Sequence, residues 1–592
     1  MQTRCLSCGN SIDGIAQLCD DCKATRQAAT KAKAEAAPQV PTAEQGAPDP
    51  TPAPLAGAGR GASAGRRSDV VAFAAIGGLL LAGIVAWLFA LGGASSIGLA
   101  SDDAATAVVL NTPTPSPAAP LAPLGYERGD CTFEMPEGEA AECGFLTVPQ
   151  SRAEPDRGRV RLPVALFRST SPNRRPDPVV YLDGGPGGNT LDEMPFVYEA
   201  VKSVAPDRDV VLFDQRGAGG SSPSLDCPEV QNVNYELLIQ PLTIEQRVIE
   251  DASAVQTCRD RLVKAGIEPT LATSAENAAD VNDLRLALGY EQWNLFGVSY
   301  GTKLALTVMR DYPEGVRSVI LDSVYPLQSD LFGERQADFD RALSAMFASC
   351  AADPTCSTAF PDLETAFYET VNDLNESPIQ FGLDVVAGRT DISARIDGVW
   401  FSGFIFSALY SEDLIAVMPQ MIFDVHNHHY KLLDRFVDAY FKDKESISVG
   451  MYYSVQCGEE MPFALREAVI GAAKAHPRLP EFAEYSAKSL FASCDTWQAP
   501  PAAGNANEAV HSAIPTLVLA GEFDPITPPA WGRLVADNLE NSFFFEFPGI
   551  GHGAVFSDEC PAGIAEAFLE SPDQEPPSAC VGGMSGVEWV VR

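Results

Sequence analysis

The distribution of apolar residues divides the chain into a long alternating body and an N-terminal part without alternation. Short apolar runs typical of buried strands occur in the body at 145–149, 160–167, 178–185, 209–217, 293–297, 317–322, 515–524 and 541–549. Helical patterns separate the later runs, at 243–265, 276–289 and 300–312 among others. Strands that alternate with helices form mostly parallel sheets with helices on both faces, so we predict the α/β fold class.

This alternation is interrupted once. From about Pro326 to about His511 the pattern is largely helical and contains no strong strand signal. We therefore expect a helical cap at 326–510, inserted over the C-terminal edge of the sheet. The sheet domain then consists of two parts, 125–325 and 511–592.

The N-terminal part contains one uncharged apolar run, which begins at Val70 with "VVAFAAIGGLLLAGIVAWLFALGG". A run of this length can cross a bilayer as a helix, and we expect a transmembrane helix at 69–92. Three arginines precede it and two aspartates follow it. The positive-inside rule therefore predicts a single-pass cell-membrane protein with a cytoplasmic N-terminus and an extracytoplasmic body.

Two segments without apolar periodicity flank this run. Residues 26–68 are rich in Ala, Pro and Gly, which predicts a disordered linker, and 93–124 form a Pro/Thr/Ser/Ala spacer. The sequence Gly98-Leu99-Ala100 resembles a signal-peptidase site, whose cleavage would release the body. Because a signal peptide seldom has ~70 residues before it, we favour a retained anchor.

Four cysteines near the N-terminus have the spacing of a metal site. Cys5, Cys8, Cys19 and Cys22 form two C-x2-C pairs ten residues apart, which predicts a structural zinc ribbon at 1–25. Two disulfides are the alternative, but C-x-x-C pairs are chiefly redox or metal motifs in reducing compartments. The sequence of the ribbon does not indicate its role, and binding to a partner in the cytoplasm is one possibility.

The ten remaining cysteines all lie beyond residue 124, in the compartment expected to be oxidising, and their even number predicts disulfides. Proximity in sequence suggests four pairs and leaves a fifth. The pairs are Cys131–Cys143, Cys227–Cys258, Cys350–Cys356, Cys560–Cys580 and Cys457–Cys494. Sequence alone does not fix this connectivity.

The charge of the chain is unevenly distributed. The 592 residues have a formal net charge of −38, with 41 Lys/Arg and 79 Asp/Glu. Residues 1–92 hold eight Lys/Arg and seven Asp/Glu, so the rest holds 33 against 72, a net charge of −39. So acidic a body argues against nucleic acid and anionic lipid headgroups as partners.

The sequence "GVSYG" at 297–301 predicts the chemistry of the body. Gly297 and Gly301 allow a tight strand-to-helix turn with Ser299 at its apex, a nucleophile elbow. Backbone N–H groups would stabilise the oxyanion of an acyl-transfer intermediate. We expect them from Tyr300, directly after the serine, and from Gly185 in "YLDGGPGGNT".

A serine nucleophile needs a base, and the base needs an orienting carboxylate. Asp524 follows the strand in "LVLAGEFDPITPP", and His552 lies in the loop of "FEFPGIGHGAVF". The order Ser, Asp, His is that of α/β-hydrolases. Asp322, at another strand end, is the second candidate for the acid. Three histidines of "HNHHY" at 426–430 are interpreted as a solvated helix face rather than a metal site.

Several motifs together carry a family resemblance. "GGPGG", "FDQRGAGGSS", "GVSYGTKLAL", "GEFDPITP" and "GIGHG" closely resemble the proline iminopeptidase and tripeptidyl aminopeptidase branch of the α/β-hydrolases, over about 131–580. The resemblance implies an α/β-hydrolase fold with no catalytic cofactor, and peptide substrates cut near a free N-terminus. It implies Ser299, Asp524 and His552 as the triad. In "SVQCGEE" it implies Glu459, with Glu460 as the second choice, as the anchor for the substrate ammonium.

One residue departs from the pattern, since Asp183 stands where iminopeptidases often have His. The leading hypothesis is a membrane-anchored extracytoplasmic serine exopeptidase. One alternative is a small-molecule esterase of the same fold, and the other is a non-catalytic sensor or binding module. The intact Ser299, Asp524 and His552 argue against the last of these.

Overall fold

The computed structural model describes residues 2–4, 11–13, 124–386 and 389–591. Near the N-terminus, β1 (Gln2–Arg4) and β2 (Ser11–Asp13) pair in antiparallel fashion. The four predicted zinc ligands and the predicted transmembrane helix at 69–92 lie outside the described residues. Within the described residues, every helix is too short or too polar to span a bilayer.

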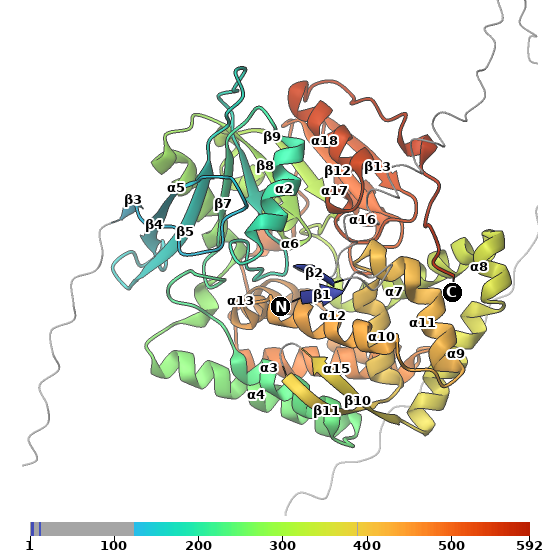
Figure 1. Ribbon diagram of the computed structural model, residues 1–592. Coiled ribbons are helices and arrows are strands. Elements are labelled where there is room, and N and C mark those ends of the chain that lie inside the picture. Colours follow the sequence, from blue (N-terminus) through green and yellow to red (C-terminus); the bar gives the residue numbers. More distant parts are fainter. Residues whose placement is uncertain (1, 5–10, 14–123, 387–388, 592) are drawn as a thin grey trace, which may run out of the picture. The chain divides into compact units, whose positions relative to one another are not determined.

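The body is built on a nine-stranded sheet with the order β13-β12-β9-β8-β6-β7-β5-β4-β3 (Figure 1). Its strands are β3 (Gly125–Arg128), β4 (Glu142–Pro149), β5 (Arg159–Phe167), β6 (Val179–Leu182), β7 (Val210–Phe213), β8 (Trp293–Val298), β9 (Val316–Asp322), β12 (Thr516–Gly521) and β13 (Ser542–Phe547). The six strands from β13 to β7 are parallel, and β5, β4 and β3 continue the sheet in antiparallel fashion. This topology confirms the predicted α/β-hydrolase fold.

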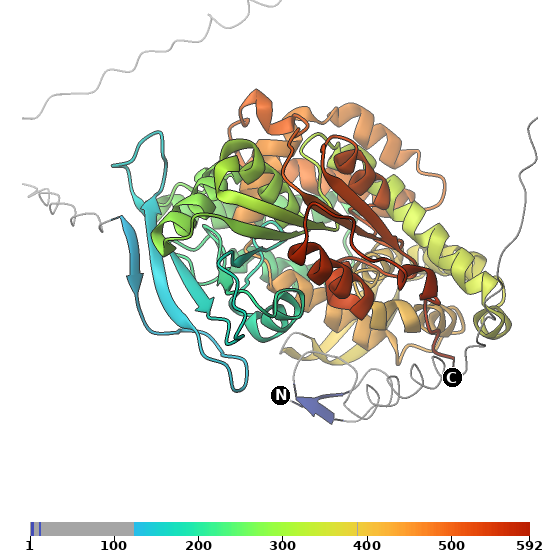
Figure 2. The same ribbon diagram turned by 90° about the horizontal axis from the view of Figure 1, so that it is seen from above.

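Helices cover both faces of the sheet, as Figure 2 shows from above. Apolar side chains of α2 (Met194–Val204) and α18 (Glu559–Glu570) join one core cluster with the strands. On the other face, α5 (Ser274–Leu288), α6 (Tyr300–Asp311) and α16 (Pro529–Ala536) contribute to a second cluster. The strands between them are buried on both sides, which explains their continuous apolar runs.

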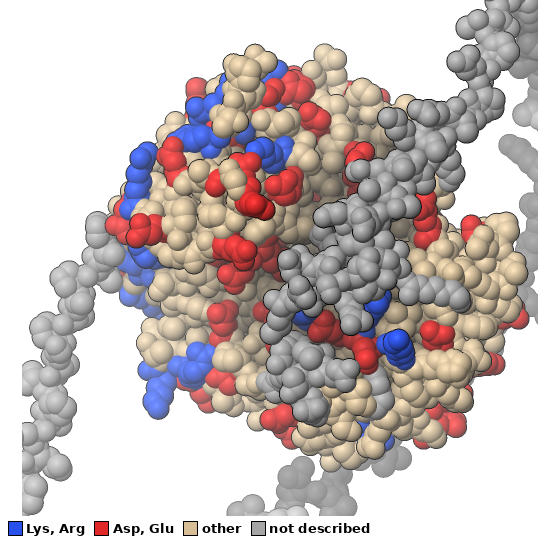
Figure 3. All heavy atoms as spheres, viewed as in Figure 1, with Lys and Arg blue, Asp and Glu red and all other residues tan. Residues whose placement is uncertain are grey.

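The edge of the sheet formed by β3, β4 and β5 is rich in charge. Figure 3 shows Lys and Arg gathered along this edge, while acidic side chains are scattered over the visible face. Arg128 and Arg168 each bind Glu142 at 3.0 Å, and Arg161 binds Glu127 at 3.1 Å. A charged edge discourages pairing with strands of other molecules. Strand β3 itself was not predicted, because it is short and mostly exposed.

Between β9 and β12 the chain forms a mainly helical layer with its own aromatic-rich core cluster. Its helices are α7 (Leu331–Ala352), α8 (Pro354–Ala359), α9 (Leu363–Glu376), α10 (Gly398–Ala408), α11 (Glu412–His426), α12 (Leu433–Glu445), α13 (Val449–Val455), α14 (Arg466–Lys474) and α15 (Pro480–Trp497). One π-helical turn, η3 (Gln456–Glu460), follows α13.

The cap differs from the prediction in two ways. It contains an antiparallel hairpin, β10 (Ile379–Val386) with β11 (Arg389–Ile396), in a stretch that was expected to be largely helical without strong strands. Its helical layer also includes α3 (Pro228–Ile239) and α4 (Ile244–Lys264), which lie between β7 and β8 in the chain. Helix α4 packs along α15, and α3 contributes side chains to the cap core. Helical periodicity predicts a helix but not the layer that it joins.

All five predicted disulfides are present in the described residues. Each has a Cα–Cα distance between 5.0 and 5.8 Å. One of them, Cys457–Cys494, ties the π-helical turn to α15. Proximity in sequence identified four of the pairs and left Cys457–Cys494, which spans 37 residues, as the fifth.

Candidate active site

The nucleophile elbow is formed as the sequence predicts. Strand β8 ends at Val298, α6 begins at Tyr300, and Ser299 between them has φ 57° and ψ −125°. Residues other than glycine rarely adopt a positive φ. Ser299 is partly exposed in this conformation. A Cβ atom at Gly301 would lie 1.8 Å from the Leu182 carbonyl oxygen, so a glycine is required there.

The predicted acid and base lie in direct contact. Nδ1 of His552 is 2.8 Å from Oδ2 of Asp524, which is fully buried. The same carboxylate accepts hydrogen bonds from the backbone N–H groups of Ile526 (3.0 Å) and Thr527 (2.8 Å) and from the Thr527 hydroxyl (2.7 Å). These three donors hold the carboxylate in one orientation and point it at the imidazole.

The two groups shift each other's pKa in opposite directions. Burial alone would raise the pKa of Asp524, but the imidazolium form of His552 and the hydrogen bonds keep it below its ordinary value. Burial alone would lower the pKa of His552, but the Asp524 carboxylate raises it above the usual range. Their charged forms therefore stabilise each other, as the acid and base of a hydrolase require.

Asp322, the second candidate for the acid, has a different set of contacts. Its carboxylate accepts hydrogen bonds from the backbone N–H groups of Ala554 (3.0 Å) and Val555 (2.8 Å). Its backbone carbonyl accepts one from the N–H of Ser299 at 3.0 Å. Burial raises the pKa of Asp322 to about 6. Asp322 thus connects the elbow to the loop of His552 and leaves the imidazole to Asp524.

Topology brings the three predicted triad residues to one edge. Strands β8, β9 and β12 are adjacent and parallel, and Ser299 and Asp524 follow the carboxyl ends of β8 and β12. His552 lies in the loop after β13, the neighbour of β12. The Ser299 hydroxyl has no hydrogen-bond partner among the described residues. It is therefore free to form one with a substrate or with the imidazole, whose Nε2 is the ring nitrogen not bound to Asp524.

The two predicted oxyanion donors come from neighbouring strands. The N–H of Tyr300 is the first of α6. Gly185, with φ 106°, is an exposed residue in the mostly buried loop after β6. A Cβ atom at Gly184 in the same loop would lie 3.0 Å from Cβ of Ser299, which places this loop against the nucleophile. The cap braces the loop, since the N–H of Ser448 donates to the Gly187 carbonyl at 2.8 Å.

Asp183, which departs from the iminopeptidase pattern, supports this loop from inside. Its carboxylate accepts hydrogen bonds from the N–H of Gly184 at 2.8 Å and from the hydroxyl of Thr190 at 3.0 Å. Burial raises its pKa above the ordinary value. The carboxylate at this position therefore stabilises the shape of the loop through hydrogen bonds within it.

Glu459 and Glu460, the predicted ammonium anchors, are both buried on the π-helical turn, with 3 % and 4 % of their surface exposed. Glu459 accepts hydrogen bonds from the N–H and the hydroxyl of Ser274, both at 2.7 Å, and the same hydroxyl lies 3.0 Å from the Tyr300 hydroxyl. Glu460 forms an ion pair with Lys303, and Glu459 lies 3.9 Å from the same ammonium. Their role in binding a substrate stays a prediction.

Sequence reasoning did not single out Ser274 or Lys303. Lys303 lies one helical turn after Ser299 and is 1 % exposed. A lysine in the mostly apolar first turns of α6 was a signal that it has a buried partner. Burial raises the pKa of Glu460 to about 7, and Lys303 opposes this rise.

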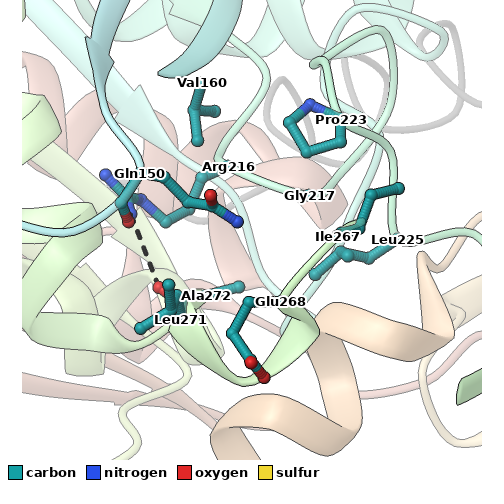
Figure 4. A pocket seen from close by; sticks show the side chains of 10 residues that line it. All are labelled: Gln150, Val160, Arg216, Gly217, Pro223, Leu225, Ile267, Glu268, Leu271 and Ala272. Carbon is teal, nitrogen blue, oxygen red and sulfur yellow. Dashed lines mark hydrogen bonds between the residues drawn. The ribbon is translucent and has the colours of Figure 1, made fainter. Parts of the chain in front are cut away.

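Other predicted or possible sites lie elsewhere. In the "HNHHY" segment, His426 hydrogen-bonds Thr370 and His428 hydrogen-bonds Tyr430. No cluster of three potential metal ligands occurs in the part of the chain that the structure describes. A cavity of about 20 Å³ lies beside Arg216, lined among others by Gln150 (Figure 4). It has room for about one water molecule and contains no residue of the predicted triad.

Comparisons with known proteins agree with this geometry. A family model described as alpha/beta hydrolase fold matches residues 177–372, and one described as TAP-like protein matches 479–580. The serine protease Hip1 of Mycobacterium tuberculosis is 26% identical over 451 residues, which cover 72% of this chain and 85% of that protein.

Two further relatives match shorter stretches. A tripeptidyl aminopeptidase of Streptomyces coelicolor is 29% identical over 240 residues, 38% of this chain and 43% of that protein. A proline iminopeptidase of Xylella fastidiosa is 29% identical over 164 residues, 28% of this chain and 37% of that protein. The chain therefore has the alpha/beta hydrolase fold, and its homologues include a serine protease, a tripeptidyl aminopeptidase and a proline iminopeptidase.

Proposed function

We propose that this protein is a serine exopeptidase that releases residues or short peptides from free peptide N-termini. The observation that carries the proposal is the contact between His552 and a fully buried Asp524, at the same sheet edge as the elbow of Ser299. The peptidase homologues support peptidase activity. Cleavage from a free N-terminus is proposed in addition.

In the proposed reaction, His552 accepts the proton of the Ser299 hydroxyl as the oxygen attacks the scissile carbonyl carbon. The raised pKa of His552 favours this transfer, and the Asp524 carboxylate stabilises the imidazolium that results. The backbone N–H groups of Tyr300 and Gly185 stabilise the oxyanion. His552 then protonates the leaving amine, and water hydrolyses the acyl-enzyme by the same steps.

Recognition of a free N-terminus needs a negative charge near the nucleophile. Glu459 and Lys303 carry formal charges of −1 and +1, and Glu460 adds a further −1 when it is ionised, above about pH 7. The group then has a net charge of −1 beside the first turns of α6. A charge-assisted hydrogen bond to an ammonium contributes roughly 1.5–3 kcal/mol, about a ten- to hundred-fold preference. We propose that this group selects substrates with a free amino terminus.

The remaining parts of the proposal concern the N-terminal segment. A helix at 69–92 would anchor the protein, with its catalytic body outside the membrane, and the five disulfides of the body suit an oxidising compartment. One structural zinc would be held by Cys5, Cys8, Cys19 and Cys22 on the cytoplasmic side. Thiol labelling of these four cysteines from outside intact cells would contradict this orientation.

A substrate panel tests the exopeptidase proposal. The full-length protein is assayed with aminoacyl and tripeptidyl chromogenic amides, each with a free and an acetylated N-terminus, and Ser299→Ala serves as the control. We expect Ser299-dependent release from the free forms and at least ten-fold lower kcat/KM for the acetylated forms. Hydrolysis of small esters without hydrolysis of any amide would favour the esterase alternative instead.

A further inference from the structure

Helix α7 of the cap contacts the start of the loop that carries Asp524 and the helix α16 that follows this loop. The guanidinium of Arg341 donates hydrogen bonds to the backbone carbonyl of Glu522, at 2.6 Å, and to that of Asp524. Two turns earlier, the Glu334 carboxylate accepts a hydrogen bond from the indole N–H of Trp531 at 2.7 Å. One face of α7 therefore holds the start of this loop and the helix α16 that follows it.

A second part of the cap rests on the loop of His552. The carbonyl oxygen of Leu409, at the end of α10, would lie 2.1 Å from a Cβ atom at Gly551, so only glycine allows this approach. The neighbouring Tyr410 packs its ring against the imidazole of His552, with 4.5 Å between the ring centroids. The base is thus held by Asp524 at one nitrogen and by a cap side chain on its ring face.

The contacts of Arg341 are unusual for a half-buried cation. Arg341 forms no ion pair among the described residues, and both of its hydrogen bonds go to backbone carbonyls of the acid loop. Burying a guanidinium without a carboxylate at hydrogen-bond distance costs free energy. A neutral donor could satisfy two carbonyl groups at lower cost. The charge and the fork geometry of arginine instead fix two carbonyls at once.

We propose that the cap holds the acid and the base of the triad in register, with Arg341 fixing the loop of Asp524 and Tyr410 fixing the ring plane of His552. Both are positioning residues, because they act through the triad. The inference rests on the proposed catalytic roles of Asp524 and His552. It makes the cap part of the catalytic geometry in addition to any role in substrate binding.

The test compares Arg341→Met with Arg341→Lys and with a matched control in the full-length protein. The control is Arg247→Met, which removes a buried arginine that binds Asp397 of the cap. The substrate is p-nitrophenyl acetate, which is small enough to need little of the cap for binding. Circular dichroism and the thermal midpoint report folding, and kcat and KM are measured from pH 5 to 9.

We expect Arg341→Met to lower kcat about ten- to hundred-fold with KM changed less than three-fold, since small displacements of catalytic groups have effects of this size. The half-maximal pH of the acid limb should fall, because a loosened Asp524 raises the pKa of His552 less. Arg341→Lys should recover part of kcat, and Arg247→Met should keep both kcat and the pH profile. The charged and aromatic groups around His552 are Asp524, Asp322, Asp443 and Tyr410.

The inference would be overturned by a folded Arg341→Met protein whose kcat lies within two-fold of the parent and whose acid limb has the same half-maximal pH. Equal losses in Arg247→Met would overturn it as well, because they would show a general effect of cap loosening. If Arg341→Met does not fold, Tyr410→Leu decides by the same two readouts. If the parent protein shows no Ser299-dependent esterase activity, the assignment of the triad is contradicted, and the proposed function with it.

Discussion

Replacing Lys303 by methionine should make the stability of the protein strongly pH-dependent. Lys303 is the cation that partners Glu460, and both side chains are almost completely buried. Burial raises the pKa of Glu460 to about 7 even with Lys303 present. Without the ammonium, the folded protein should avoid a buried unpaired carboxylate by keeping Glu460 protonated to a higher pH.

The magnitude follows from proton linkage. A carboxyl whose pKa is raised on folding contributes stability at low pH and loses it as the pH rises through the folded pKa. In the parent this loss ends at about pH 7. In Lys303→Met the folded state still holds the proton above pH 7 while the unfolded state does not. The free energy of unfolding of Lys303→Met should therefore fall further below that of the parent by about 1.4 kcal/mol per pH unit above pH 7. This deficit relative to the parent should be about 2 kcal/mol larger at pH 8.5 than at pH 7.

Urea unfolding of the full-length protein, with its disulfides intact, measures this deficit at pH 6.5, 7.5 and 8.5. The double variant Lys303→Met/Glu460→Gln should lose the pH dependence, because no titrating carboxyl remains in the pair. Lys488→Met is the control, since Lys488 binds Glu245 and Glu484 near the surface and such pairs contribute little. A deficit that is equal at pH 6.5 and 8.5, or a slope that persists in the double variant, would refute the reasoning.

Three further predictions concern catalysis. Ser299→Ala should abolish ester and peptide hydrolysis with an unchanged thermal midpoint, and activity near that of the parent would exclude the elbow as the site. The acid limb of kcat/KM should lie above the ordinary imidazole pKa of about 6.5, and Asp524→Asn should lower both this limb and kcat. Asp322→Asn should lower kcat several-fold and the thermal midpoint by a few degrees, because an amide offers one acceptor for two N–H groups after His552. An unchanged pH profile in Asp524→Asn, or full activity in Asp322→Asn, would contradict these assignments.

The parallel part of the sheet could be predicted because burial on both faces leaves continuous apolar runs in the sequence. The run at 293–297 and the helical pattern at 300–312 correspond closely to β8 and α6. Their junction was predictable too, since a serine between two glycines has few structural explanations. Local sequence therefore specified the elbow, where the geometry depends on a few neighbouring residues.

The cap was less predictable, because its structure depends on contacts between distant segments. The hairpin of β10 and β11 lies among helices, and Gly382 and Asp384 interrupt the first of its runs. Helices α3 and α4 have ordinary amphipathic patterns, but their apolar faces pack against the cap. Such a choice of layer is made by tertiary packing, and single-sequence periodicity contains no information on it.

The same distinction separates the proposed triad from the residues that surround it. Ser299, Asp524 and His552 could be singled out because each follows a strand, and the carboxyl ends of parallel strands meet at one edge. Arg341 and Tyr410 reach that edge only because the cap docks on it, and neither belongs to a motif. Their contacts go to backbone carbonyls and a ring face, which many sequences can provide. It follows that the cap can change such supporting residues while the triad stays the same, provided that the acid and base loops remain held.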